Sequence, residues 1–210
     1  MSIKKLVAVL VLVLGLGIQS ANAAPITFNF MDYANVNGEK GYQTLVWPSG
    51  SLTLTITATA PDDDLIQYYA YTDNGDINGP GGLGVCKDVN GSNLCKPLGE
   101  DNMTPGEMLD FVFNQDVDIT ELVFSNHAFA GITTAVGITA DAIPSNLTLA
   151  PRVALLSVNA VSYSGSHFTM TANDGPVYLT SMTIVPVPEP GSLSLMGLGI
   201  LGLSFLRRRK

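Results

Sequence analysis

The chain has 210 residues, of which 13% are charged, and its formal net charge at pH 7 is −8. Six of the ten basic residues lie near the two ends, so residues 24–190 hold four basic and all 18 acidic residues, a formal charge of −14. A charge of this sign and size argues against nucleic acid and anionic lipid as partners of this region.

The first 23 residues have the three parts of a secretory signal peptide. Lys4 and Lys5 form a basic segment, an apolar run from Leu6 to Ile18 follows, and Ala21-Asn22-Ala23 supplies the small residues of a cleavage site. The run is short for a permanent membrane anchor, and no stop-transfer pattern follows it. Residues 1–23 are therefore predicted to be removed after Ala23 during export by the general secretion machinery.

Residues 24–186 are predicted to form one exported, all-β domain. In Leu52–Ala58 apolar residues alternate with threonines, as in a strand with one buried face. Clusters of Gly, Pro, Asn and Asp separate such segments, which favours a single β-sandwich, jelly-roll-like in topology. No segment of 12 residues between the two ends has a clean helical period. Further strands are expected at Ile26–Phe30, Gln67–Thr72, Met108–Phe113, Ile119–Ser125, Val136–Ala140, Val153–Val161, His167–Thr171 and Val177–Val185.

Five aromatic residues allow two interpretations. An aromatic face packs well against a sugar ring, so these residues are candidates for a sugar-stacking platform. Packing in the core, or ordinary strand composition, explains them equally well. They are Tyr42, Trp47, Tyr68, Tyr69 and Tyr71.

The segment from Asp73 to Gly84 is interpreted as a polar, glycine-rich loop. Asn74, Asp76 and Asn78 match the alternating oxygen ligands in the first half of a calcium loop. The twelfth position is Val85 instead of Glu, and the flanks resemble strands, which excludes an EF-hand. The favoured interpretation is a loop without an ion or any other cofactor, and the alternative is a calcium site of another kind. Such a site would borrow ligands from Asp88, Glu100, Asp101, Asn102 or Glu107.

Cys86 and Cys95 are the two cysteines of the chain, and Asn90-Gly91 between them is a tight-turn signal. In an oxidising compartment two such cysteines most simply form a structural disulfide. The alternatives are a metal-thiolate pair and a catalytic cysteine. A metal site would need further ligands, and the chain has only two histidines.

Catalytic signals are weak. Ser166-His167 and Asn126-His127 are the two candidate nucleophile–base neighbours, and the sequence has no Gly-x-Ser-x-Gly nucleophile elbow. Asp62-Asp63-Asp64 is interpreted as a solvated turn. No catalytic residue is predicted, and the protein is expected not to be an enzyme.

The last 24 residues have the layout of a sorting tail. Val187-Pro188-Glu189-Pro190 precedes an uncharged run from Gly191 to Leu206, and Arg207-Arg208-Arg209-Lys210 ends the chain. A helix over the run would measure about 24 Å, a little less than a bilayer core, which predicts a short or transient span of the inner membrane. The basic end should stay in the cytoplasm, with the preceding residues on the far side.

This tail resembles the PEP-CTERM sorting signal of Gram-negative bacteria over residues 187–210. The resemblance implies recognition by exosortase, a membrane cysteine transpeptidase, at Pro188, Glu189 and Pro190, with Arg207, Arg208 and Arg209 as the basic end. It implies a membrane-anchored precursor that is processed to a cell-surface or extracellular-matrix protein.

Exosortase systems commonly accompany exopolysaccharide production. The resemblance therefore also implies a non-enzymatic matrix or biofilm protein that binds extracellular polysaccharide. The alternative is a secreted glycan-active hydrolase on the same β-sandwich scaffold.

Overall fold

The computed structural model of the protein describes residues 23–60, 66–75, 79–97, 101–125, 134–140, 143–149 and 156–188. Residues Ala24–Val187 form one compact unit. The predicted signal peptide up to residue 22 and the sorting tail from Glu189 onward, including its apolar segment, lie outside the described residues. Within the described ranges, no helix has the length and apolar character needed to cross a bilayer.

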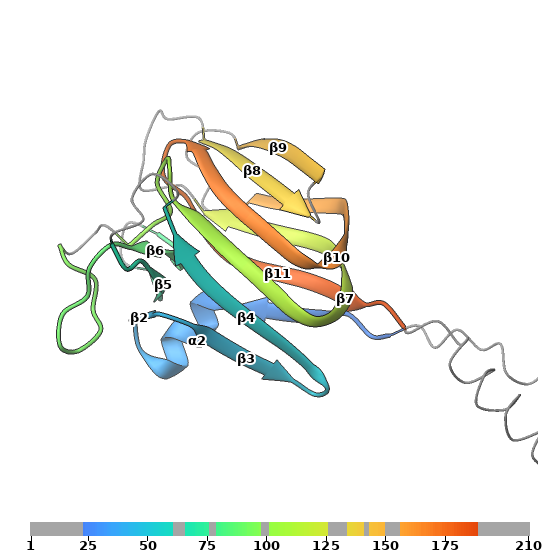
Figure 1. Ribbon diagram of the computed structural model, residues 1–210, viewed down its shortest axis with the longest axis horizontal. Helices are drawn as coiled ribbons and strands as arrows, with labels where there is room; N and C mark the ends of the chain where they lie inside the picture. The colour runs from blue at the N-terminus through green and yellow to red at the C-terminus, as the bar shows by residue number, and fades with distance from the viewer. Residues whose placement is uncertain are drawn as a thin grey trace, which may run out of the picture. The chain divides into compact units, whose positions relative to one another are not determined.

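The described residues form eleven strands in one continuous sheet, with one short helix (Figure 1). The predicted all-β class is confirmed. The helix is α2 (Phe30–Asn37) and the strands are β1 (Ile26–Asn29), β2 (Lys40–Tyr42), β3 (Leu45–Ser49), β4 (Leu52–Thr59), β5 (Tyr69–Asp73), β6 (Gly82–Cys86), β7 (Met108–Ser125), β8 (Thr134–Ala140), β9 (Ile143–Leu149), β10 (Leu156–Asp174) and β11 (Tyr178–Pro186).

Two long strands, β7 and β10, join the two halves of the sheet. They pair antiparallel along most of their length. On the other edge of β7, β4 pairs with Met108–Phe113 and β11 pairs with Val117–Ser125. The strands β8 and β9 extend the sheet beyond β10, whereas β6, β5 and β2 extend it beyond β11 (Figure 1). The strand β7 contains two segments that the sequence predicts as separate strands. The strand β10 contains one predicted strand, His167–Thr171, and the part of another, Val153–Val161, that begins at Leu156.

Both halves of the sheet bury their apolar faces in one shared core, as expected for a β-sandwich. In β4 the predicted alternation is confirmed, because Leu52, Leu54 and Ile56 are buried and the threonines between them are half-exposed. Phe111 from the first half of β7 and Phe124 from the second half belong to the same core cluster. The core thus spans both halves of the sheet.

A β-bulge keeps the apolar face of β7 directed at this core. Ile184 of β11 pairs with Ile119, and Thr183 pairs with Glu121, so Thr120 is an extra residue at the junction. Along β7, the buried apolar side chains accordingly lie at odd-numbered residues up to Ile119 and at even-numbered residues from Leu122. Without this extra residue, the second half of the strand would turn its apolar side chains outward.

The helix α2 differs from the sequence prediction, in which the first strand includes Phe30. Asn29 ends β1 and caps the helix, since its side chain accepts the backbone N–H of Asp32 at 3.0 Å. Gly38 ends the helix with its N–H donating to the carbonyl oxygen of Ala34. Only Phe30 and Ala34 of this eight-residue helix are buried, which is too few to give a visible helical period in the sequence.

The strand β6 corrects the prediction of one loop from Asp73 to Gly84. The strand begins at Gly82, and all five of its residues are buried. A strand buried on both faces has no polar alternation, and its glycines resemble a loop composition. The short edge strands β2 and β3, and also β9, are likewise absent from the predicted set.

Candidate ligand-binding site beside the disulfide

The predicted disulfide between Cys86 and Cys95 is confirmed. The two sulfur atoms are 2.04 Å apart, the Cα atoms are 5.7 Å apart, and both residues are buried. The segment between them turns at Asn90, whose side-chain oxygen accepts the backbone N–H groups of Ser92 at 2.8 Å and Leu94 at 3.1 Å. This polar side chain makes the hydrogen bonds that hold the tip of the loop.

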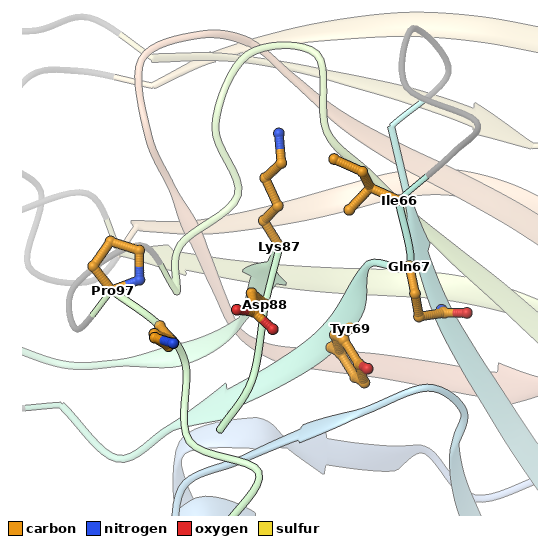
Figure 2. Close-up of a pocket in the computed structure, with 7 residues that line it drawn as sticks. Ile66, Gln67, Tyr69, Lys87, Asp88 and Pro97 are labelled. Atoms are coloured by element: carbon orange, nitrogen blue, oxygen red, sulfur yellow. The ribbon is translucent and has the colours of Figure 1, made fainter. Parts of the chain in front are cut away.

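A hollow of about 490 Å³ lies beside this disulfide loop (Figure 2). Its described lining comes from three short segments, which are the residues entering β5, those leaving β6 and those following Cys95. The pairing of Tyr69 with Cys86 in the sheet brings the first two segments together, and the disulfide adds the third. The lining residues are Ile66, Gln67, Tyr69, Lys87, Asp88, Lys96 and Pro97.

The hollow combines apolar surface with hydrogen-bonding groups. Ile66 is 38% exposed, which is high for a large aliphatic side chain. Figure 2 shows Ile66, Gln67 and Tyr69 on one side and Pro97 on the other, with Lys87 and Asp88 between them. An aromatic ring and aliphatic groups can cover the C–H surface of a ligand, while the amide, carboxylate and ammonium groups can bind its polar atoms.

The ring of Tyr69 is held in place by packing. It lies against the buried cluster of Tyr71, Cys86 and Cys95, together with Val89. Gly41 of β2 approaches the same residues so closely that an added Cβ would lie 2.6 Å from Cγ1 of Val89. The N–H of Gly41 also donates to the carbonyl oxygen of Asn93 at 2.7 Å, which ties the disulfide loop to the sheet. One wall of the hollow is therefore fixed before any ligand arrives.

The lysines and the acid of the hollow lie on two segments that are joined beside the disulfide. The backbone N–H of Lys96 donates to the carbonyl oxygen of Asp88 at 2.8 Å, so the two chains that leave the disulfide run side by side. The ammonium group of Lys87 lies 6.0 Å from the centre of the Tyr68 ring, at the limit of a cation–π contact. Both lysines are exposed.

The five aromatic residues considered as a sugar platform do not form one surface. Tyr68 and Tyr71 are buried, and Trp47 packs edge-to-face with Phe28 at 5.4 Å between ring centres. Tyr42 is half-buried and packs against the core. Only Tyr69 of the five lines the hollow, so packing accounts for most of this set.

The predicted calcium ligands lie only partly within the described residues. Asn74 is exposed after β5, and Asp76 and Asn78 lie outside the described residues. Of the acids considered as additional ligands, Asp101 accepts a hydrogen bond from Tyr178, and Glu107 accepts two from Thr104. In the part of the chain that the structure describes, no three acidic, histidine or cysteine residues are grouped to hold a metal ion. Calcium binding by the loop stays the untested alternative to a loop without an ion.

The carboxyl group of Glu39 lies beside that of Asp73, near the start of this loop. Glu39 and Asp73 are hydrogen-bonded to each other through their side chains, and Asp101 is close enough to act on Glu39 by its charge. Burial, followed by the hydrogen bond and the like charge of Asp73, raises the pKa of Glu39. The carboxyl group of Glu39 therefore keeps its proton to a higher pH than an isolated glutamate does.

The described histidine, His167, pairs with Asp110 across β10 and β7. Their side chains approach to 2.5 Å on an exposed part of the sheet. Its neighbour Ser166, weighed above as a nucleophile, is not brought into any catalytic group by the described contacts, and His127 lies outside the described residues. A surface hydrogen bond of this kind needs no catalytic explanation.

The processing residues lie at the ends of the described part. Ala23 is half-buried and Pro188 is exposed. Ala21, Glu189, Pro190 and Arg207–Arg209 lie outside the described residues, so their assignment to cleavage and sorting stays a prediction.

Among known protein families, the PEP-CTERM protein-sorting motif matches residues 186–210. No curated protein matches the chain. One similar solved structure is the family 32 carbohydrate-binding module of C. perfringens NanJ in complex with galactose. It shares 11% identity over 70% of this chain and 98% of its own, with a TM-score of 0.31, which is too low to assign a ligand. The tail of this chain is a PEP-CTERM sorting motif, which indicates an exported protein.

Proposed function

We propose that this chain is a non-enzymatic protein of the cell surface or extracellular matrix, which binds polysaccharide in the hollow beside the disulfide. Its precursor is anchored in the inner membrane by residues 191–206, with a cytoplasmic C-terminus, until exosortase processes the tail. The sorting motif supports the export route. The disulfide and the strongly acidic composition suit an oxidising, extracellular setting.

The composition of the hollow is the observation that carries carbohydrate binding. A pyranose ring presents C–H groups on its faces and hydroxyl groups around its edge. Tyr69, Ile66 and Pro97 can cover the C–H groups. Gln67 and Asp88 can form hydrogen bonds with the hydroxyl groups. The volume of about 490 Å³ lies within the range of small-molecule sites.

The same lining favours binding over cleavage. Asp88 is the single carboxylate among the described lining residues, whereas most glycosidases use a pair of carboxyl groups. We therefore propose that the protein is retained in the polysaccharide matrix and does not degrade the polysaccharide.

The test is co-sedimentation of residues 24–187 with the exopolysaccharide of the host, in calcium and again in EDTA, combined with an assay for released reducing ends. This fragment contains the whole described core and the disulfide. We expect co-sedimentation without sugar release, and sugar release would instead support the hydrolase. Loss of sedimentation in EDTA alone would assign a role to calcium.

Two matched variants locate the binding site. Gln67→Ala removes an exposed amide that lines the hollow, whereas Gln43→Ala removes another exposed amide outside its described lining. We expect the first variant to sediment less and the second to behave like the wild type. Equal sedimentation of both variants would move the binding surface away from the hollow.

A further inference from the structure

Basic charge is concentrated at the hollow. Residues 24–190 contain four basic residues, Lys40, Lys87, Lys96 and Arg152, against 18 acidic ones. Two of these four line the hollow, together with one acid, Asp88. The described lining is therefore net positive in a region whose formal charge is −14.

The disulfide fixes the backbone positions of both lysines. Lys87 directly follows Cys86, and Lys96 directly follows Cys95. Because the two cysteine Cα atoms are held 5.7 Å apart, the lysine side chains leave from neighbouring points of a rigid backbone. The hydrogen bond from Lys96 N–H to the Asp88 carbonyl oxygen adds a second restraint. The disulfide therefore places two positively charged side chains at one hollow.

We propose that the hollow selects acidic saccharides, with Lys87 and Lys96 binding the carboxylate of a uronic acid unit. This inference rests on the proposed function and names its ligand class. Tyr69 covers a face of the sugar ring, and Asp88 accepts hydrogen bonds from its hydroxyl groups. Contacts between ammonium and carboxylate groups act at short range, whereas the repulsion from the acidic surface is screened beyond about 10 Å in 0.1 M salt.

The experiment is calorimetric titration of the 24–187 fragment with tetramers of galacturonate and of glucuronate. Its chemical control is the same pair of tetramers with the carboxyl groups reduced to primary alcohols. We expect the acidic tetramers to bind at least about tenfold more tightly than the reduced ones. We also expect the affinity for the acidic tetramers to fall as sodium chloride is raised from 50 to 500 mM.

Variants test the lysines directly. Lys87→Gln and Lys96→Gln should each weaken binding about threefold to fivefold, the range of a partly exposed ion pair. Lys40→Gln makes the same charge change at a lysine outside the described lining and should leave the affinity unchanged. Lys87→Arg keeps the charge and should retain most of the binding. Circular dichroism of each variant shows whether the fold persists.

The outcomes separate this inference from the proposed function. If reduced and acidic tetramers bind equally, or if the glutamine variants bind acidic tetramers like the wild type, the acidic selectivity is wrong while carbohydrate binding stands. If neither tetramer binds but the host polysaccharide co-sediments, the uronate assignment alone fails. If no saccharide binds at all, the proposed function fails as well.

Discussion

The hydroxyl group of Tyr178 donates a hydrogen bond of 2.6 Å to the carboxylate of Asp101. This contact joins the start of β11 to the segment that precedes β7, 77 residues earlier in the chain. Burial, followed by the negative charges of Asp101 and Asp73, raises the pKa of Tyr178 strongly. The phenol therefore stays protonated and serves as a permanent donor to the acidic group.

Tyr178→Phe should lower the free energy of unfolding by about 1.5 kcal/mol, because it removes a hydrogen bond to a charged acceptor and keeps the ring. Chemical denaturation followed by circular dichroism measures this change. Tyr69→Phe, at a half-buried tyrosine for which no hydroxyl hydrogen bond is described, is the control and should change stability less. Equal stability of Tyr178→Phe and wild type would mean that Asp101 finds an equally good donor elsewhere.

Glu39→Gln should stabilise the fold at neutral pH and not under acid conditions. The pKa of Glu39 is raised in the folded state, so the folded protein binds this proton more tightly than the unfolded chain. Its contribution to stability is fully present below the ordinary glutamate pKa and is lost as pH rises through the raised value. The glutamine removes this loss, a gain of about 0.5 kcal/mol because the pair is partly solvated.

Thermal unfolding between pH 4 and pH 8 tests this prediction. Asp116→Asn removes one negative charge at an exposed position of β7 and serves as the control for net charge. A gain that is the same at pH 4 and pH 8, or that Asp116→Asn reproduces, would contradict a specific repulsion between Glu39 and Asp73.

The strands that could be predicted from the sequence are those with one buried face. β4 shows this most simply, because its alternating leucines and threonines report burial directly. The joining of two predicted segments into β7 was not predictable, since the polar residues 114–116 and the bulge at Thr120 interrupt the apolar alternation without ending the strand. The strand β6 lacks any alternation, because both of its faces are buried.

The candidate site could be predicted only in part. The cysteine spacing and the turn at Asn90 predict the disulfide. The hollow itself depends on bringing Tyr69 beside Cys86, and no local pattern encodes that cross-strand contact. Lysines that directly follow both cysteines were a signal in the sequence, but their meaning became clear only when the disulfide placed them at one hollow.

Gly84→Ala should destabilise the fold by about 3 kcal/mol, at the upper end for overpacking a buried position. An added Cβ would meet the carbonyl oxygen of Asp101 and lie 2.7 Å from Cα of Asn102, and these backbone atoms cannot rotate away. Gly91→Ala is the matched control, since nothing lies within 4 Å of its added Cβ. Denaturant midpoints of the two variants give the comparison, and equal midpoints would show that β6 moves freely.

Replacing both Cys86 and Cys95 by alanine should lower the free energy of unfolding by about 2.7 kcal/mol, the chain-entropy value for a loop of about ten residues. The same variant should bind acidic tetramers more weakly at a temperature where it is still folded, because Lys87 and Lys96 lose their shared anchor. Calorimetry and denaturation are measured on the same sample. Unchanged binding by the folded variant would show that the sheet alone positions the lysines.

Replacing both Pro188 and Pro190 by alanine should leave the unprocessed precursor in the inner membrane. The change keeps Glu189 but removes two proline rings, which restrict the backbone and which we expect exosortase to recognise. Membrane fractionation of the native host and mass spectrometry of the C-terminus report the processing. Pro186→Ala, at the last residue of β11, alters a nearby proline outside the Pro-Glu-Pro segment and should be processed normally. If the double variant is released like the wild type, processing does not depend on the two prolines. The acidic-saccharide site would then have to account for retention at the cell surface by itself.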